Sequence, residues 1–540
     1  MRHGGRILAD QLRIQGVERV FSVPGESFLA ALDGLFDVGI PNVVCRHEGG
    51  AAMMAEATAK LTGRPGVAFV TRGPGAANAS AGLHVAMQDS TPMVLFVGQI
   101  ARDHRDREAF QEVDYRAFLG PLVKWAAEVD ATDRLPEYVA RAFSVAQSGR
   151  PGPVVLALPE DMLSAEADVA DRPPVVPPVP AVPDLDPVVA RLRDAARPLV
   201  VAGGPGWTQA ASDALARWAT RHGLPVAVTF RRQDAVDNRA AIYAGDLNVG
   251  PNPALMDRLA GADAILVLGA RLGDIATGGY AALDPRRAPD GLIHVHPDPS
   301  ELNRVWPAAI PVLARGPDVA LALAARDDAA MGHDPGPARA AYDAWTVPRE
   351  TPGAVKLEAV IRHLDDVLPE DAILTNGAGN YAAFLHRYYR WKRVGTQLAP
   401  TSGSMGYGLP AAVAASIAHP GRTVVCLAGD GCLQMTLNEM STAVQHGATP
   451  IVVVCDNGRY GTIRMHQERH YPGRVSGTDL ANPDFAALAR AYGGQGWTVT
   501  TQDQFADALA AARECGVLAV IHLKLDPRML STGADLEERA

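Results

Sequence analysis

RTVVCLAGDGCLQMTLNEMSTAVQHGATPIVVVCDNGRYG, residues 422–461, contains two apolar runs rich in β-branched residues, with a glycine turn after the first and a polar turn after the second. The segment between the two runs is helical in pattern. The stretch therefore predicts one strand–helix–strand unit. Because a right-handed crossover makes the two strands parallel, Asp430 and Asn457, 27 residues apart, are expected at strand carboxyl ends on the same edge of a sheet.

The same alternation of short apolar runs and helical stretches extends through the rest of the chain. VAFV and MVLFVG occur in the first third, and PLVVAGG and AILVLGA occur in the second. Runs of this length suit parallel strands that crossover helices bury on both faces. The sequence therefore predicts an α/β fold with three open, doubly wound parallel-sheet domains, whose ligands bind beyond the carboxyl ends of the strands.

Two shifts in composition divide the chain. Prolines are so frequent in residues 171–187 that neither a helix nor a central strand is expected, and this stretch is predicted to be a stiff linker. A second boundary, rich in Pro, Gly and small polar residues, is expected within residues 325–353. The predicted parts are a first domain at 1–170, the linker at 171–188, a central domain at 189–335 and a third domain at 353–540.

Composition excludes several classes of protein. Of the 540 residues, 48% are hydrophobic and 20% are charged, which is typical of a compact chain and not of a disordered one. A net charge of -10 without a basic cluster argues against nucleic acid as a partner. Five cysteines without a CxxC pair indicate no disulfide framework. No secretory signal and no stretch of roughly 18 apolar residues is present, so the sequence predicts a cytoplasmic protein without a membrane partner.

Asp430 and Asn457 are candidate ligands for a hard cation. A carboxylate oxygen, an amide oxygen and a nearby main-chain carbonyl suit Mg²⁺, which keeps its other positions for water and phosphate oxygens. Gly429 and Gly431 allow the backbone to approach a phosphate, and the following helix N-terminus adds donors. Either residue alone is better explained as part of a simple turn, but the pair favours the metal site.

Basic residues add to this expectation. No acidic residue occurs between Asp371 and Asp430, whereas five basic ones do: Arg387, Arg390, Lys392, Arg393 and Arg422. An unopposed positive stretch favours phosphate binding. The alternative is that the cluster at 387–393 is a solvated helix end.

GDG followed 27 residues later by the asparagine of a DNG turn resembles the motif of thiamine-diphosphate enzymes. The resemblance implies that Asp430, Asn457 and the carbonyl of Arg459 hold the Mg²⁺ that anchors the diphosphate. The family usually has Asn where this chain has Asp456, while the ligating Asn457 is retained. The third domain is then the diphosphate-binding domain.

Further glycine-rich turns, TNGAGN (375–380) and SGSMGYGLPAA (402–412), resemble the segments that wrap the cofactor. The resemblance implies that Gly403 offers its carbonyl to the pyrimidine amine and that Met405 wedges the cofactor into a bent form. The alternative for Met405 is a gap-filling core residue. The full set of implied cofactor-binding residues is Gly25, Glu48, Gly377, Gly403, Met405, Gly429, Asp430, Gly431, Cys432, Asn457, Tyr460 and Gly461.

Glu48 lies in VVCRHEGGAAMMAEATAKLTG, between an expected strand and an apolar helix. Taken alone it is best explained as a first-turn acid stabilised by the helix dipole. However, FSVPGES, RHEGGAA, TRGPGAAN and QDSTPMVLFVGQ follow the order and spacing of the pyrimidine-binding domain of acetolactate synthase-like enzymes. That resemblance implies that the Glu48 carboxyl, its ionised form disfavoured by apolar neighbours, shares a proton with the aminopyrimidine ring. It also implies active sites between two chains, in a homodimer or a dimer of dimers.

Four further residues bear on the reaction. AFQEVDY (109–115) resembles the segment whose Phe110 and Gln111 reach the active site of acetolactate synthases, and Arg271 resembles an arginine aimed at the second 2-oxo acid. The alternative for Arg271 is an ion pair with Asp274. His466 stands near a substrate-selecting tryptophan of the family. Two other departures from the biosynthetic synthases are Leu272, where they have Phe, and Arg72, where they have Ser.

The predicted activity is thiamine-diphosphate- and Mg²⁺-dependent decarboxylation of a 2-oxo acid with carboligation to a second carbonyl. The alternatives are a non-ligating decarboxylase of an aryl, guanidino or other 2-oxo acid, an acyl-CoA lyase of the same family, or a silent binding protein. A nicotinamide dehydrogenase is disfavoured, because the loose GxGxxA of Gly377, Gly379 and Ala382 lacks an acidic residue about 20 positions later. The central domain resembles one that holds FAD in some relatives; FAD binding is left open and is not predicted.

Overall fold

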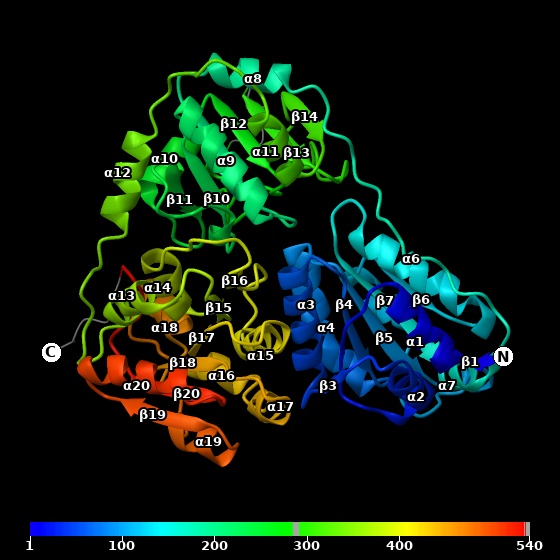
Figure 1. Cartoon of the computed structure of the whole chain (residues 1–540). Helices are drawn as coiled ribbons and strands as arrows, with labels where there is room; N and C mark the ends of the chain where they lie inside the picture. The colour runs from blue at the N-terminus through cyan, green and yellow to red at the C-terminus, as the bar shows by residue number, and fades with distance from the viewer. Residues whose placement is uncertain (284–290, 534, 536–540) are drawn as a thin grey trace.

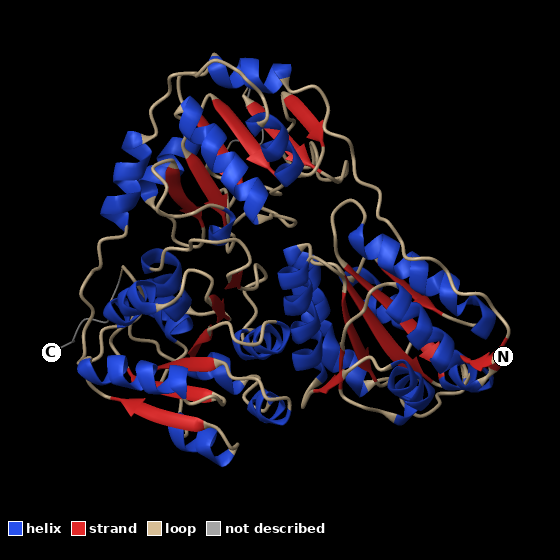
Figure 2. Cartoon of the chain, in the orientation of Figure 1, coloured by secondary structure: helices blue, strands red, loops and turns tan. Residues whose placement is uncertain are grey.

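The computed structural model describes residues 1–283, 291–533 and 535. Residues 536–540, the end of the predicted third domain, lie outside them. Three lobes occupy the corners of a triangle, with the central lobe at the top of Figure 1, the first lobe at the right and the third at the lower left. Each lobe contains a six-stranded parallel sheet with helices on both faces (Figure 2), so the predicted fold class is confirmed. No helix of the described residues is long and apolar enough to cross a membrane.

The first lobe has the strand order β3-β2-β4-β5-β7-β6. Its strands are β2 (Val20–Ser22), β3 (Asn42–Val44), β4 (Gly66–Val70), β5 (Met93–Gln99), β6 (Trp125–Glu128) and β7 (Pro153–Pro159). Its helices are α1 (Gly4–Ile14), α2 (Leu29–Val38), α3 (Glu48–Thr62), α4 (Pro74–Asp89), α5 (Tyr115–Leu119), α6 (Leu135–Gln147) and α7 (Glu160–Ser164). Two short antiparallel strands, β1 (Arg2–His3) and β8 (Glu166–Ala167), lie beside this sheet. Every residue of β4, β5 and β7 is buried, as expected for parallel strands covered on both faces.

The third lobe repeats the topology of the first. Its strand order is β16-β15-β17-β18-β20-β19. When the strands of each sheet are numbered along the chain, both sheets have the order 2-1-3-4-6-5. Its strands are β15 (Ile373–Asn376), β16 (Gln397–Leu398), β17 (Val424–Gly429), β18 (Ile451–Asp456), β19 (Gln495–Val499) and β20 (Ala519–Lys524). Its helices are α13 (Leu357–Val367), α14 (Asn380–Tyr388), α15 (Gly408–Ala418), α16 (Asp430–Gln434), α17 (Glu439–Gln445), α18 (Gly461–His470), α19 (Phe485–Ala491) and α20 (Asp503–Glu514).

The central lobe differs from the other two, because its order β11-β10-β9-β12-β13-β14 corresponds to 3-2-1-4-5-6 along the chain. This is the Rossmann order. Its strands are β9 (Pro198–Ala202), β10 (Val226–Thr229), β11 (Tyr243–Leu247), β12 (Ala264–Leu268), β13 (Leu292–His296) and β14 (Ile310–Leu313). Its helices are α8 (Asp186–Arg193), α9 (Gln209–His222), α10 (Pro253–Ala260) and α11 (Gly316–Ala324).

Two connections join the lobes. Residues 168–185 contain no helix or strand, and the start of this stretch is bound to α1, since Gln11 Nε2 donates to the Arg172 carbonyl and Gln11 Oε1 accepts from Arg172 N, both at 2.9 Å. The second connection contains helix α12 (Gly336–Trp345), which its composition did not indicate. Ala338 and Tyr342 of α12 are buried against the central lobe. This tertiary packing stabilises the helix although turn-forming residues flank it.

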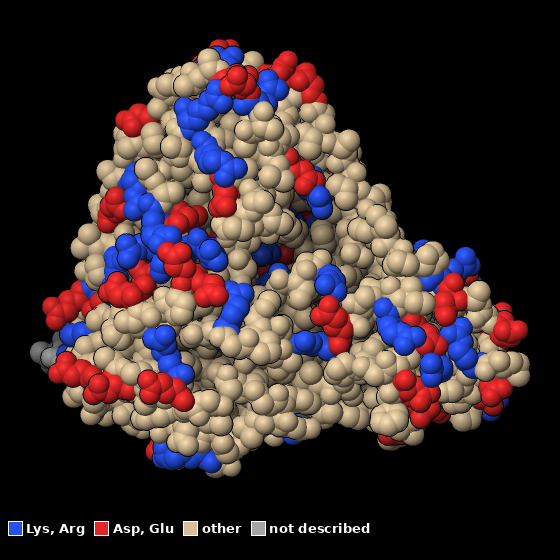
Figure 3. Space-filling model, in the orientation of Figure 1, with Lys and Arg blue, Asp and Glu red and all other residues tan. Residues whose placement is uncertain are grey.

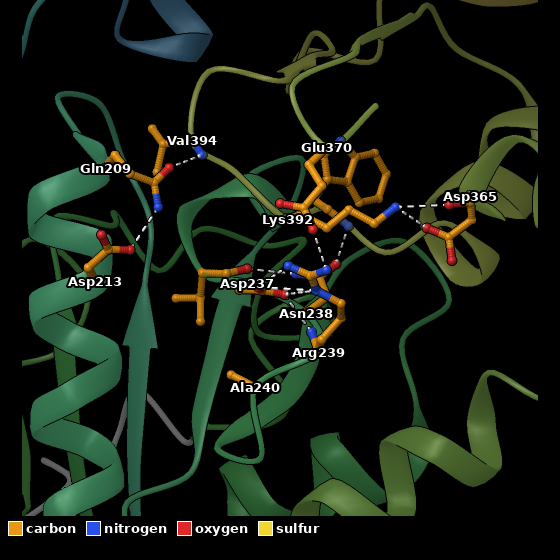
Figure 4. Close-up of polar contacts among 12 residues, drawn as sticks. Gln209, Asp213, Asp237, Asn238, Arg239, Ala240, Asp365, Glu370, Lys392 and Val394 are labelled. Carbon is orange, nitrogen blue, oxygen red and sulfur yellow. Dashed lines mark hydrogen bonds and ion pairs between the residues drawn. The ribbon is translucent and has the colours of Figure 1, made fainter. Parts of the chain in front are cut away.

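Three of the five basic residues of 387–422 are bound by groups of the protein, so the expectation of an unopposed positive stretch is wrong for them. Arg390 Nε and Lys392 Nζ bind the buried carboxylate of Asp365, and Arg422 Nε donates to the Asp371 carbonyl at 2.9 Å. Figure 4 shows Lys392 pointing toward Asp365, at the contact between the central and third lobes where Asn238 and Arg239 also lie. Asp365 and Asp371 lie outside the stretch without acidic residues, so the sequence pattern did not show that these partners are present.

A buried charge network joins the first and third lobes. Glu56 and Lys60 on α3 form an ion pair of 3.0 Å, and Lys60 also binds Asp89 at the end of α4. From the third lobe, the Tyr407 hydroxyl donates to Glu56 at 2.6 Å and Thr401 N donates to Asp89 at 2.7 Å. The network therefore holds the loop 399–407, which contains Gly403 and Met405, against the first lobe.

Removal of the cation from this network is expected to destabilise the protein. Lys60→Met would leave the carboxylates of Glu56 and Asp89 buried without their common partner, at a cost of about 3 kcal/mol. Thermal unfolding should show a midpoint several degrees lower. Arg64→Met, which removes a mostly exposed cation paired with the exposed Glu18, should leave the midpoint nearly unchanged; an equal shift in both variants would contradict the role assigned to Lys60.

Candidate active site

A pocket lies at the carboxyl edge of the third sheet. Strands β15, β17 and β18 end beside it, where the strand order reverses between β15 and β17. A reversal of this kind opens the crevice in which ligands of open α/β sheets bind. The predicted residues that line the pocket are Gly403, Met405, Gly429, Asp430, Gly431, Cys432, Asn457, Arg459, Tyr460 and Gly461. The sequence therefore located the pocket from the ends of β17 and β18.

Asp430 is the first residue of α16 and is almost fully buried. Its Oδ1 accepts from the Gly431 amide at 2.8 Å, and its Oδ2 accepts from the side chain of Asn482 at 2.7 Å. Burial raises the pKa of Asp430 to about 6. No lysine, arginine or histidine of the described residues lies within ion-pair distance of this carboxylate. A buried carboxylate without a protein cation is a suitable ligand for a metal ion.

The other two predicted ligands lie beside Asp430. Asn457 follows β18 directly and its Nδ2 donates to the Met529 carbonyl at 3.2 Å, which leaves the side-chain oxygen for a ligand. Arg459 lines the same pocket. A group of three His, Cys, Asp or Glu side chains able to hold a metal does not occur among the described residues. One carboxylate, one amide oxygen and one backbone carbonyl nevertheless make a hard oxygen set that suits Mg²⁺, and this set fits the pocket.

Asn482 was not predicted, although it contacts two acids of the site. Its Nδ2 lies 2.7 Å from Asp430 Oδ2 and 2.7 Å from Asp456 Oδ1. It comes from the loop before α19, 52 residues after Asp430, and no local pattern links the two positions. Its role as a bridge becomes visible only in the folded chain.

Asp456, the residue at which this chain departs from the family pattern, is balanced by its neighbours on β20. Its Oδ2 is 2.8 Å from His522 Nε2 and 2.7 Å from Lys524 Nζ. Burial acts to raise the pKa of Asp456, but the hydrogen bonds from His522, Lys524 and Asn482 together hold it well below the usual range. The extra charge is therefore neutralised beside the pocket.

The glycines of the pocket are required by packing. An ideal Cβ on Gly431 would lie 2.5 Å from the ring of Tyr460, and one on Gly429 would lie 2.8 Å from the ring of Tyr381. Gly377 does not line the pocket, but its Cβ would lie 2.4 Å from Cys432 Sγ. The Cys432 sulfur accepts hydrogen bonds from the Tyr381 hydroxyl and from Gly406 N. Because these glycines have no side chain, the residues on either side of the turns can pack closely.

Met405 lines the pocket and also packs against the core cluster around Tyr381 and Cys432. The wedge role and the core role are therefore compatible. Gly403 has a φ of 67° and open space at its Cβ position, so this turn needs a glycine for its backbone conformation.

A second group of predicted residues lies at the carboxyl edge of the first sheet, around the loop 71–73 that follows β4 and the first turn of α4. An ideal Cβ on Gly25 would meet Thr71 at 2.6 Å, one on Gly73 would meet Gln111 at 2.9 Å, and one on Gly75 would lie 3.3 Å from Glu48 Oε1. Glu48 opens α3, directly after the N-cap His47, and its Oε2 accepts from Asn78 at 2.9 Å. Phe110, beside Gln111, is 73% exposed.

The single chain does not bring the two groups together. All described residues that line the pocket of Asp430 belong to the third lobe, and neither Glu48, Phe110, Gln111 nor Gly25 is among them. The structure therefore contains two half-sites, one on the first sheet and one on the third. They occupy corresponding places, because both lie where the strand order 2-1-3 reverses.

Arg271 and His466 lie outside both groups as the structure defines them. Arg271 is largely buried, which lowers its pKa, and its Nη2 donates to the Gln88 carbonyl at 2.9 Å. Within the described residues it forms no ion pair with Asp274, so that alternative is wrong. His466 lies on α18, where its ring stacks on His470 with centroids 6.2 Å apart. Their predicted substrate roles stay predictions.

A second pocket lies where the three lobes meet, and Figure 3 shows a recess with basic and acidic atoms at this meeting point. It is lined by Arg271 and Asp274, by Gly204 and Gly269 at the order reversal of the central sheet, and by Asp89. We assign no flavin to it. Charges of both signs are interspersed over the face shown in Figure 3.

Comparison with known proteins gives three family-model matches along the chain. Residues 2–118 match the N-terminal TPP binding domain of thiamine pyrophosphate enzymes, residues 185–323 match their central domain, and residues 377–523 match their C-terminal TPP binding domain. The two TPP binding domains contain the two half-sites.

Curated relatives match over nearly the whole chain. The acetolactate synthase large subunit of Parasynechococcus marenigrum (strain WH8102) is 33% identical over 94% of this chain and 85% of its own length. The acetolactate synthase isozyme 2 large subunit of Escherichia coli (strain K12) is 32% identical over 97% of this chain and 96% of its own. The acetolactate synthase large subunit of Haemophilus influenzae (strain ATCC 51907 / DSM 11121 / KW20 / Rd) is 30% identical over 94% and 92%.

Asn482→Ala is expected to weaken metal-dependent cofactor binding. Loss of the bridge removes one of the two hydrogen bonds that orient the carboxylate of Asp430, and loss of such an outer partner commonly lowers metal affinity about tenfold. Titration calorimetry of thiamine diphosphate at several Mg²⁺ concentrations should therefore show a higher Mg²⁺ requirement.

Two variants calibrate that measurement. Asp430→Ala should remove the Mg²⁺ dependence altogether. Asn438→Ala changes an asparagine of the same lobe whose side chain caps no helix, and it should bind as the natural chain does. If Asn482→Ala also binds unchanged, the bridge has no part in holding the metal ligand.

Proposed function

The chain belongs to the thiamine pyrophosphate enzyme family, and from this premise we propose that it decarboxylates a 2-oxo acid and joins the remaining fragment to a second carbonyl compound. It is a thiamine-diphosphate-dependent enzyme of the acetolactate synthase-like kind. The relatives are named as acetolactate synthases, which favours acetolactate as the product. Two molecules of pyruvate that lose one carbon dioxide supply its carbon atoms, so we propose pyruvate as donor and acceptor.

The observation that supports the proposal most is the buried, cation-free carboxylate of Asp430 beside Asn457 and Arg459. Asp430, Asn457 and the Arg459 carbonyl would hold Mg²⁺, and the turn at Gly429 and Gly431 would receive the diphosphate. The amide groups at the start of α16 add hydrogen-bond donors.

Bound thiamine diphosphate supplies the carbon nucleophile and the electron sink that cleavage next to a carbonyl requires. The protein groups orient it and control one proton. We propose that Glu48 holds this proton against the aminopyrimidine ring, that the Gly403 carbonyl accepts from the pyrimidine amine, and that Met405 keeps the cofactor bent. Gly25 and Gly377 shape the turns on either side.

A second copy of the chain is part of the proposal, because Glu48 and Asp430 lie on separate half-sites of one chain. A homodimer, or a dimer of dimers, would place the first lobe of one copy on the third lobe of the other. Exposed apolar side chains flank both half-sites and would be buried by this contact: Phe110 is 73% exposed, Met435 53% and Ile463 53%.

Substrate residues complete the proposal. Phe110 and Gln111 would reach the reacting carbons from the partner copy, Arg271 would attract the carboxylate of the second 2-oxo acid, and His466 would limit its size. We keep a non-ligating decarboxylase or an acyl-CoA lyase as the second candidate, because Leu272 and His466 differ from the biosynthetic pattern. A cytoplasmic location, with no nucleic-acid or membrane partner, stays a prediction.

Glu48→Gln should nearly abolish turnover and leave cofactor affinity within about twofold, because the amide cannot donate its proton while its size and the contact with Asn78 are kept. Steady-state rates and titration calorimetry on the same preparation test this. The matched control is Glu18→Gln, an exposed acid of the same lobe that pairs with Arg64, and its rate should equal that of the natural chain. Unchanged turnover in Glu48→Gln would remove the proton role.

Product analysis decides between ligation and release. The purified protein with Mg²⁺ and thiamine diphosphate, given pyruvate alone, should form acetolactate that NMR detects directly. A panel of other 2-oxo acids follows under the same conditions. Aldehyde from another acid, with pyruvate unchanged, would contradict the synthase reaction and move the assignment to the decarboxylase.

A further inference from the structure

The loop 71–73 after β4, together with the first turn of α4, which contains Gly75, forms the centre of the half-site on the first sheet. Thr71 contacts Gly25 and shares a hydrogen bond of 2.9 Å with Ser27, Gly73 packs on Gln111, and Gly75 packs on Glu48. The one large side chain of this loop is Arg72. It occupies the position where the sequence departs from the serine of acetolactate synthases, and the roles derived above do not explain it.

Arg72 is turned inward, with a side chain only 9% exposed. Each of its three nitrogens has an acceptor. Nε donates to the Phe110 carbonyl at 3.3 Å, Nη1 lies 3.3 Å from a Glu160 oxygen, and Nη2 lies 3.4 Å from a Glu26 oxygen. Because every nitrogen of the guanidinium is engaged, Arg72 is not a free anion site. Two of its contacts anchor the guanidinium to the first lobe, and the third reaches the segment around Phe110.

That segment has a conformation which needs support. Gln111 has a φ of 64°, in the left-handed region that residues other than glycine seldom adopt, and Glu108 and Asp106 also have positive φ. Neither Phe110 nor Gln111 belongs to a helix or strand, and Phe110 is mostly exposed. Strained backbone of this kind persists only when surrounding groups hold it in place.

Contacts from inside and outside hold this segment. Within it, the Glu112 carboxylate accepts from the amides of Asp106 and Ala109 at 2.8 Å and 2.9 Å, and two further contacts come from the residues after β4. The Arg72 guanidinium binds the carbonyl of Phe110, and the amide of Gly73 donates to the Tyr115 hydroxyl at 2.8 Å. Both groups come from consecutive residues after β4. The carboxylates of Glu160 and Glu26 bind the two outer nitrogens of Arg72, and this pairing orients its planar fork so that Nε faces the Phe110 carbonyl.

We propose that Arg72 is a positioning residue that fixes the Phe110–Gln111 peptide, and through it the way the enzyme receives the second carbonyl substrate. This inference rests on the proposed function for the substrate role and on the structure alone for the fixed peptide. The serine of relatives does not have the length to reach the same three acceptors at once.

Hydrogen–deuterium exchange tests the fixed peptide without any reaction. In Arg72→Ser, peptides that span residues 106–114 should exchange about tenfold faster than in the natural chain, because the left-handed segment has lost its support. Arg64→Ser is the matched control, since Arg64 precedes β4 as Arg72 follows it and pairs with the exposed Glu18. In the control the same peptides should exchange at the natural rate.

Kinetics test the substrate role. With a fixed concentration of the donor 2-oxo acid and a different 2-oxo acid as the acceptor, Arg72→Ser should lose about tenfold in kcat/KM for the acceptor, while release of carbon dioxide from the donor in the first turnover stays near the natural rate. Arg72→Lys should recover part of the loss, because it keeps the charge but not the fork. A merely structural defect would lower both steps together.

A second variant covers the case in which Arg72→Ser does not fold. Glu160→Gln leaves the arginine in place and removes one of its two charged partners, so the same exchange and kinetic changes should appear at smaller size.

Natural exchange rates in the 106–114 peptides of these variants would overturn the inference. Faster exchange with unchanged use of the second substrate would overturn the positioning role. If the natural chain forms no ligated product, the proposed function and the substrate role fail together, while the exchange result still supports or overturns the fixed peptide.

Discussion

All strands of a parallel sheet end at the same edge, and the pocket of Asp430 and the half-site on the first sheet both depend on that constraint. The turns after β17 and β18 bring Asp430 and Asn457 into one pocket, and the turn after β4 gathers Gly25, Glu48 and Gln111. In the first and third sheets the strand order reverses at the same point, between the first and third strands along the chain. The half-sites are therefore equivalent places in two copies of one topology, although the residues that occupy them share no pattern.

The parts of the site that follow strands were predictable from sequence, because an apolar run and the turn after it are local signals. Asp430, Asn457 and Glu48 are of this kind. Asn482 is not, since it reaches Asp430 from a loop 52 residues away. The prediction from the basic residues fails for the same reason: Arg390 and Lys392 bind Asp365, which precedes the stretch without acidic residues, so their charge is already neutralised. Sequence spacing identifies residues on one strand end, but it does not identify contacts between loops.

Departures from the family pattern are explained by contacts that the sequence does not display. Asp456 adds a carboxylate next to the pocket, and its cost is offset by His522 and Lys524 on the neighbouring strand β20. Arg72 adds a buried cation, which two carboxylates and a carbonyl accept. In both cases the substituted residue is charged and its partners are contributed by separate elements. Considered without its neighbours, each added charge would be expected to destabilise the site, whereas in the folded chain both charges are paired.

Helix α3 connects the two half-sites through the interior of one chain. Its first residue, Glu48, faces the half-site of the first sheet, while Glu56 and Lys60, two and three turns further on, bind the loop 399–407 that carries Gly403 and Met405. In the proposed dimer the Glu48 end serves one active site and the Lys60 end supports the cofactor loop of the other. Because the Lys60 end is buried among charges that must stay paired, α3 has little freedom to shift along its axis. The position of Glu48 in one site is then set by the packing that supports the other.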